Sequence, residues 1–163
     1  MGMIGQFQTV SADQLDNILK APHAIADFLY KPGADKSERI DVDKAWHGIH
    51  FLLAGTTWEA NNTAGEAVMG GRVVAEIDLG MGPCRYHTVE RVREISSELE
   101  KLAPDTLKPR FDPAAMMQNA IYPMMWDQND PDDLKYLISN YRKLQKFYME
   151  AGQKGSAMLL WIS

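Results

Sequence analysis

The apolar run near the end of the chain constrains the fold more than any other segment. Residues 157–162 have the sequence Ala-Met-Leu-Leu-Trp-Ile and follow a Gly155-Ser156 break. Six residues are too few for an independent helix, and a continuous apolar run of this length is typical of a strand that is buried on both faces. We therefore predict a sheet with helices packed on both sides.

The beginning of the chain predicts a second strand. Residues 3–10 alternate loosely between apolar and polar side chains, and Ser11 and Gln14 then form a capping box that opens a helix. Mainly helical patterns lie between the two terminal strands. We predict one α/β domain spanning residues 1–163, of three-layer αβα type, with a mixed sheet that contains both terminal strands.

The middle of the chain carries clear helix signals. Apolar residues recur at helical spacing, Thr88 and two Asp-Pro pairs mark helix starts, and Gly55 marks a helix end. These signals predict helices over residues 40–54, 88–103, 113–119 and 131–151. The segments predicted as loops are residues 34–39, 57–71 and 78–87, with one helical turn near 66–69 and a short strand at 73–75.

Charge and composition exclude several classes of partner. The chain has 17 Lys and Arg against 22 Asp and Glu, a formal charge of -5, and no basic cluster, so we expect neither nucleic acid nor membrane partners. Cys84 is the single cysteine, which excludes an internal disulfide. The start of the chain lacks the pattern of a signal peptide, and no apolar run approaches the ~18 residues of a membrane span. We expect a cytoplasmic protein.

A cluster on the 40–54 helix resembles a metal site. Asp43, His47 and His50 stand at i, i+4 and i+7, so they can share one helix face. No further ligand pattern such as H-E-x-x-H accompanies them. We favour the alternative, in which Asp43 caps the helix, His47 is exposed and His50 is hydrogen-bonded at the edge of the core. No metal and no cofactor are therefore predicted.

Cys84 and Arg85 follow a Gly82-Pro83 turn that matches neither glycine-rich nucleotide motif. Without a base placed beside it, Cys84 is better interpreted as a small buried hydrophobe than as a nucleophile. Arg85 is suited to present its planar charged fork to a carboxylate or phosphate. The alternative is an internal ion pair with an acidic residue. We assign Gly82 and Pro83 a structural role in the loop.

The segment from Tyr122 to Trp126 is rich in aromatic residues and methionine. Such side chains can line a pocket or a partner surface, because methionine adapts its shape and tryptophan is a common anchor. They can also cover the core as a lid. We favour the lid, because apolar residues at the ends of loops usually pack inward.

Several of these motifs, in one order along the chain, resemble the YfbM-like family of small bacterial proteins, a domain of unknown function. The matching segments are residues 1–5, 40–55, 78–86, 111–116 and 121–123, together with Trp126. The resemblance implies a single three-layer α/β domain in a bacterial cytoplasm, and it implies no activity. The family pattern includes Asp43, Lys44, Trp46, His50, Gly82, Pro83 and Arg85, but it does not require His47 or Cys84.

These residues support two main functional hypotheses. The first is a non-enzymatic ligand-binding or protein-interaction domain, whose partner is a small anionic ligand or another protein. Its candidate contacts are Trp46, His50, Arg85, Tyr122 and Trp126. The alternative is a small-molecule enzyme in which His50 acts as general acid or base and Arg85 stabilises an anionic substrate. The acidic net charge alone suggests a third role, as an inhibitor of a basic protein.

Overall fold

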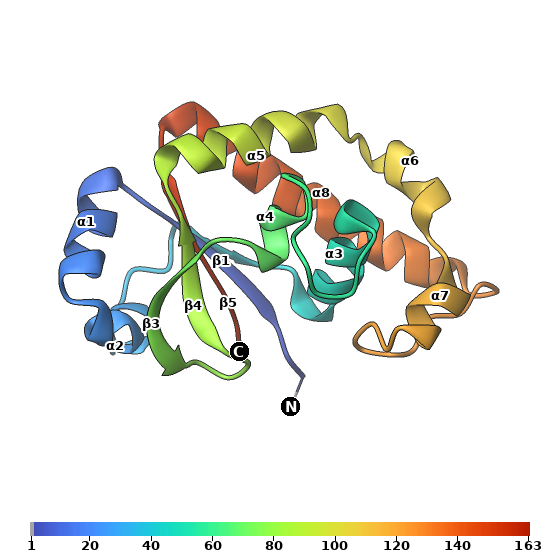
Figure 1. Ribbon diagram of the computed structural model, residues 1–163, viewed down its shortest axis with the longest axis horizontal. Helices are drawn as coiled ribbons and strands as arrows, with labels where there is room; N and C mark the ends of the chain where they lie inside the picture. Colours follow the sequence, from blue (N-terminus) through green and yellow to red (C-terminus); the bar gives the residue numbers. More distant parts are fainter. Residues whose placement is uncertain (1) are drawn as a thin grey trace.

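A computed structural model describes residues 2–163 of the chain. In these residues five strands form one sheet in the order β2-β1-β5-β4-β3. The strands are β1 (Gly5–Val10), β2 (Arg39–Asp41), β3 (Arg72–Asp78), β4 (Pro83–His87) and β5 (Ala157–Ile162). The two terminal strands lie side by side at the centre of the sheet, with Gly5 opposite Ile162 (Figure 1).

All pairs of neighbouring strands are antiparallel, so the prediction of a mixed sheet is wrong in this detail. A short turn joins β3 to β4, and a connection of this length can join only antiparallel strands. Strand β5 then runs antiparallel to both of its neighbours, β1 and β4. The predictions of an α/β fold and of a sheet containing both terminal strands are confirmed.

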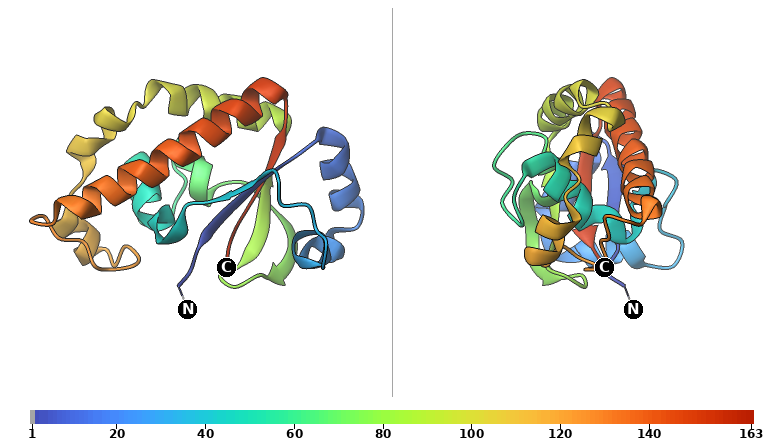
Figure 2. Two further views of the ribbon diagram at one scale, coloured as in Figure 1. Left: turned by 180° about the vertical axis from the view of Figure 1, so that it is seen from behind. Right: turned by 90° about the vertical axis from the view of Figure 1, so that its right-hand side faces the viewer.

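Helices cover both faces of the sheet (Figures 1 and 2). The smaller layer consists of α1 (Ala12–Lys20) and α2 (Ile25–Tyr30), which are joined by a 3₁₀ turn. The larger layer contains α3 (Trp46–Ala54), α4 (Glu66–Met69), α5 (Val89–Lys101) and α8 (Pro131–Lys154). The short helices α6 (Pro104–Leu107) and α7 (Pro113–Gln118) extend this layer beyond the sheet.

Strand β5 explains why three layers form. All six of its residues are buried, and their side chains alternate between two apolar cores. Ala157, Leu159 and Trp161 belong to the core beneath α1 and α2, whereas Met158, Leu160 and Ile162 belong to the core of the larger layer. This alternation follows from the two-residue repeat of a strand, and it confirms the prediction that the strand is covered on both faces.

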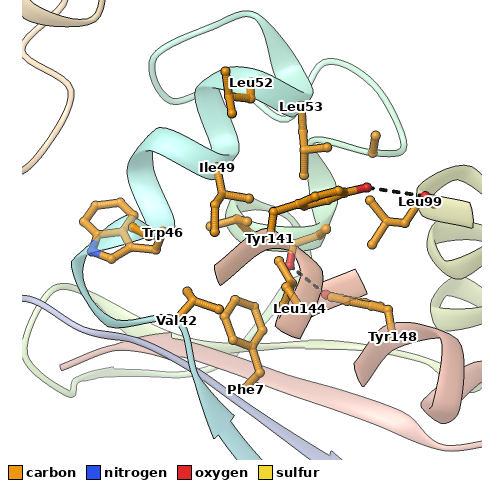
Figure 3. Packing of buried hydrophobic residues seen from close by; sticks show 14 of the residues in the cluster. Phe7, Val42, Trp46, Ile49, Leu52, Leu53, Leu99, Tyr141, Leu144 and Tyr148 are labelled. Carbon is orange, nitrogen blue, oxygen red and sulfur yellow. Dashed lines mark hydrogen bonds between the residues drawn. The ribbon is translucent and has the colours of Figure 1, made fainter. Parts of the chain in front are cut away.

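The larger core is built around tyrosine and aliphatic side chains from α3, α5 and α8 (Figure 3). The hydroxyl of Tyr141 donates to the carbonyl oxygens of Leu99 and Leu102, at 3.3 and 2.7 Å. This satisfies its one polar atom within the core and ties α8 to the end of α5. Helices α5 and α8 pack against each other along the outer edge of the layer.

Most predicted helix ends agree closely with the structure, but the helix predicted over residues 40–54 begins only at Trp46. Ser11 and Gln14 form the capping box of α1, and the side chain of Thr88 caps α5. Asp112 and Asp130 cap α7 and α8, each followed by a proline in the first turn. Gly55 and Gly155 end α3 and α8 in left-handed conformation. These signals act within a few residues of the chain, so they can be recognised without the tertiary structure.

Two strand assignments differ from the prediction. Strand β2 lies where a loop and a helix start were expected, and β4 includes Cys84 and Arg85, which were expected in a loop. The actual turn covers residues 79–82, where the carboxylate of Asp78 accepts hydrogen bonds from the amides of Gly80 and Gly82, both at 2.9 Å. In residues 2–163 no helix is both long and apolar enough to cross a membrane.

Candidate functional site

Arg85 points into the larger helical layer and binds backbone carbonyl oxygens. Its guanidinium donates from Nη1 to Met69 and from Nη2 to Val68, the latter at 3.2 Å. Both carbonyls belong to α4. The structure therefore does not present Arg85 on a loop, and the internal partner is the backbone, not the expected acidic residue.

Four side chains bind five successive carbonyls of this segment. The Nδ1 atom of His50 lies 3.3 Å from the Gly65 oxygen, Nε2 of His87 lies 2.9 Å from the Glu66 oxygen, and the Tyr148 hydroxyl lies 2.7 Å from the Ala67 oxygen. Arg85 donates to the next two carbonyl oxygens, those of Val68 and Met69. We refer to His50, Arg85, His87 and Tyr148 as the bracing cluster.

The length of α4 explains why this cluster exists. The helix has only four residues, so the carbonyls of Ala67, Val68 and Met69 lack the intrahelical partners that a longer helix would supply. Burying such carbonyls without partners is costly. Tyr148 and Arg85 supply the missing donors. The carbonyls of Gly65 and Glu66 accept from the backbone amides of Met69 and Gly70, and His50 and His87 respectively add a second hydrogen bond to these two carbonyls. Together these side chains hold the segment Gly65–Met69 in place.

The histidines of the bracing cluster are neutral at pH 7. Burial lowers the pKa of His50 to about 4, and burial also lowers the pKa of His87. Because Nδ1 of His50 donates to a carbonyl, its Nε2 is an acceptor, and this atom is buried without a hydrogen-bond partner. His50 has no exposed surface and a pKa far below neutrality, which does not suit a general acid or base.

His47 and Asp43 also differ from the expected arrangement. His47 is fully buried, accepts a hydrogen bond at Nδ1 from the Tyr122 amide at 3.0 Å, and donates from Nε2 to the Thr57 oxygen at 2.9 Å. Asp43 does not cap the helix, since it has a φ of 49° and its carboxylate accepts from the Tyr136 hydroxyl at 2.9 Å. Among residues 2–163, no three His, Cys, Asp or Glu side chains are grouped to hold a metal ion.

The predicted aromatic contacts lie mostly in the core. Trp46 is fully buried and stacks on Tyr122, and its indole donates to the Met3 oxygen at 3.1 Å. Trp126 is 5% exposed and donates to the Ile121 oxygen at 2.8 Å. Trp126 therefore packs inward as the lid interpretation predicted, whereas Met124 and Met125 of the same segment are 52% and 65% exposed and do not cover the core. A ligand in solvent cannot reach Trp46 or His50, so we no longer place a ligand groove at these residues.

A solvent-accessible polar pocket lies directly beside the bracing cluster. It has a volume of about 530 Å³ and lies among α4, the β3–β4 pair and the beginning of α5. Its polar lining consists of Glu66, Arg72, Tyr86, His87, Thr88 and Arg91. His87 belongs both to the bracing cluster and to the pocket wall. The cluster therefore holds α4, which forms one wall of what we call the polar pocket.

Arginine residues dominate the charge of the polar pocket. Arg91 donates to both carboxylate oxygens of Glu66, and this contact lowers the pKa of Glu66. Arg91 also pairs with Glu94, outside the lining. Arg72 makes no ion pair among the described residues. With His87 neutral, the lining carries two cations and one anion, and the positive N-terminus of α5 begins at Thr88.

The charged residues of this pocket carry no recognisable sequence pattern. Glu66, Arg72 and Arg91 come from three elements, and no local pattern relates them. The Gly70-Gly71 pair is the one local sequence feature that indicates a special backbone conformation at this pocket. Gly71 has a φ of 92°, and a Cβ atom there would lie 2.8 Å from the Tyr86 oxygen. Glycine thus permits the close backbone approach that forms one wall of the pocket.

The fold and this site define a small three-layer α/β domain in which a braced short helix supports a polar pocket. The family described as "Domain of unknown function (DUF1877)" matches residues 1–161, and the chain belongs to this family. It is 25% identical over 157 residues to Protein YfbM of Escherichia coli (strain K12), covering 88% of this chain and 92% of that protein. The family resemblance is thereby confirmed.

The fold is also that of a solved structure. The crystal structure of YfbM from Escherichia coli, described as a protein of unknown function, matches with a TM-score of 0.78 at 23% identity. The match covers 98% of this chain and 99% of that chain. It confirms a single α/β domain of this architecture.

Proposed function

We propose that this protein is a non-enzymatic binding protein for a small anionic ligand, and that the ligand occupies the polar pocket. The observation that carries the proposal is the lining: two arginines and one carboxylate surround about 530 Å³ in a chain whose net charge is -5. This volume is within the range of roughly 300 to 1,000 Å³ that is typical of small-molecule sites. The lining therefore has a net charge of +1 in a chain that is negative overall, and Arg72 is its unpaired cation among the described residues.

The roles of the lining residues follow from their contacts. Arg72 is exposed, so it is the cation most available to a ligand. Arg91 already holds Glu66 in a two-point contact, so a ligand carboxylate or phosphate competes with Glu66 for this guanidinium. The Nε2 atom of His87 is hydrogen-bonded to the backbone carbonyl oxygen of Glu66, so Nδ1 is the ring nitrogen that remains for a ligand.

A thermal-shift measurement tests the proposal. Inorganic phosphate, citrate and glucose 6-phosphate are compared with uncharged glucose, because a ligand that binds only the folded state raises the melting temperature. We expect at least one anion to raise it and Arg72→Ala to reduce that shift. Lys36→Ala is the control, since it removes one positive charge from an exposed position outside the pocket.

The outcomes separate the candidate roles. A shift that is equal in wild type and Arg72→Ala would contradict binding in the polar pocket. No shift with any anion would contradict the proposal and leave the protein partner as the alternative. Turnover of a phosphorylated probe by the purified protein would instead support the enzyme hypothesis.

A further inference from the structure

A second hollow lies on the larger helical layer, apart from the polar pocket. It has a volume of about 480 Å³ and lies between Lys108 and the first half of α8. Its α8 lining includes Pro131, Leu134, Lys135, Ile138 and Arg142. These positions are three or four residues apart or fall on successive turns, so they share one face of the helix. We refer to this hollow as the α8 groove.

The rim of the α8 groove is basic. Lys108, Lys135 and Arg142 line it, and its lining contains no carboxylate. Asp105 stands beside this rim: its carboxylate pairs with Lys108 at 2.6 Å, and the hydrogen bond and charge of Lys108 and the charge of Arg142 all lower its pKa, so three cations face one carboxylate. Lys135 and Arg142 make no ion pair within 4.0 Å in the described part of the chain. In a chain of net charge -5, this is a local excess of positive charge.

The floor of the groove is apolar. Pro131 and Leu134 contribute to it, and Ile138, which is 6% exposed, joins the floor to the main core. The hydroxyl group of Ser139 is the one uncharged polar side chain in the lining. An apolar floor with cations around it matches a molecule that has an apolar chain and an anionic head group.

We propose that the α8 groove binds a free anionic amphiphile, a monocarboxylate with a short alkyl chain. The carboxylate lies against Lys135 and Arg142, and the alkyl chain covers Leu134 and Ile138. The groove shares no residue with the polar pocket. The failure of one proposal therefore does not affect the other.

Octanoate is the probe for a test by NMR titration of the amide resonances. We expect saturable shifts confined to residues around 105–108 and 131–142. Acetate lacks the alkyl chain and octanamide lacks the charge, so both should bind more weakly. Charge reversal by the double change Lys135→Glu and Arg142→Glu should weaken octanoate binding by about tenfold.

Two control variants locate the effect. Lys154→Glu reverses an exposed charge on the same helix three turns beyond the groove, and Lys36→Glu reverses an exposed charge on a distant loop; both should leave octanoate affinity unchanged. Equal affinity for octanoate and octanamide would overturn the role of the cations. Absence of octanoate binding, or shifts centred on the apolar hollow between α1 and α2, would overturn the proposal.

Discussion

Arg85 stabilises this protein through two hydrogen bonds to backbone carbonyls, so its replacement should first of all lower the free energy of unfolding. Arg85→Ala leaves the carbonyls of Val68 and Met69 without their donor. We expect the free energy of unfolding to fall by about 3 kcal/mol, because each such bond involves a charged donor and a carbonyl in a largely buried segment. Urea denaturation measures the change. Arg85→Lys should lose less, since it keeps the charge but not the two-point fork.

Arg72→Ala is the matched control, because Arg72 lies exposed on the neighbouring strand β3. Its unfolding free energy should remain within about 0.5 kcal/mol of wild type. Full stability of Arg85→Ala would show that the bracing contacts contribute little. A stable Arg85→Ala that has lost anion binding would return Arg85 to the role first expected for it, a direct ligand contact.

His50 should make the protein less stable as the pH falls. The unfolded chain takes up a proton at this residue near pH 6.5, whereas burial lowers the folded-state pKa to about 4. Between these values the unfolded state binds more protons, so stability present above pH 6.5 is lost toward pH 4. The loss from His50 is on the order of 3 kcal/mol.

The test is urea denaturation of wild type and His50→Gln across this pH range. His50→Gln should show a shallower decline, whatever its stability at neutral pH. Part of the decline should remain, because burial also lowers the pKa values of His47 and His87. Identical slopes for the two proteins would contradict a depressed pKa at His50.

At the scale of whole elements, the sequence predicted those features that depend on neighbouring residues. The cap of α5 at Thr88 and the C-terminal glycine of α8 were recognised because each acts within one helical turn. Strand β2 was missed because it has three residues, none of them buried, at the edge of the sheet. Strand β4 was missed because the glycines of the preceding turn and Pro83, the first residue of the strand, obscured a segment whose partners are distant in sequence.

The candidate site was harder to predict for the same reason. His50 and Arg85 were predicted as site residues, and the structure does bring both to the segment Gly65–Met69. There they bind backbone carbonyls inside the protein and do not face solvent. The pocket itself needs Arg72 and Arg91 to approach Glu66, and that approach depends on how α4 packs between α3 and β4. Side-chain type and spacing contain no information on such packing.

The connection from α4 to β3 depends on Gly71, and Gly71→Ala should be markedly destabilising. At its φ of 92° an alanine is strained, and its Cβ would lie 2.8 Å from the Tyr86 oxygen of the paired strand. Strain and clash together should cost about 2 to 3 kcal/mol. Gly33→Ala is the control, because Gly33 has a φ of 81° but nothing within 4 Å. Its cost should be near 1 kcal/mol from strain alone.

Thermal or urea unfolding of both variants measures the difference. Because Gly71 also lines the polar pocket, Gly71→Ala should weaken any anion shift that Gly33→Ala leaves unchanged. Equal destabilisation by the two changes would show that the close approach to β4 can relax at little cost.

For the molecule as a whole, we expect β5 to make the two helical layers one cooperative unit. It pairs with both β1 and β4, and its side chains enter both cores. Leu159 and Leu160 are adjacent, fully or almost fully buried, and lie on opposite faces. Unfolding of either layer exposes one face of this strand, so the layers should not unfold independently.

Leu159→Ala and Leu160→Ala test this coupling. Each change should lower the free energy of unfolding by about 3 kcal/mol, from lost burial and the cavity left behind. Each variant should still unfold in one transition, with tryptophan fluorescence and far-ultraviolet circular dichroism giving the same midpoint. If Leu159→Ala instead produced an early transition confined to α1 and α2, the smaller layer would be an independent unit. The sheet would then separate the two cores instead of coupling them.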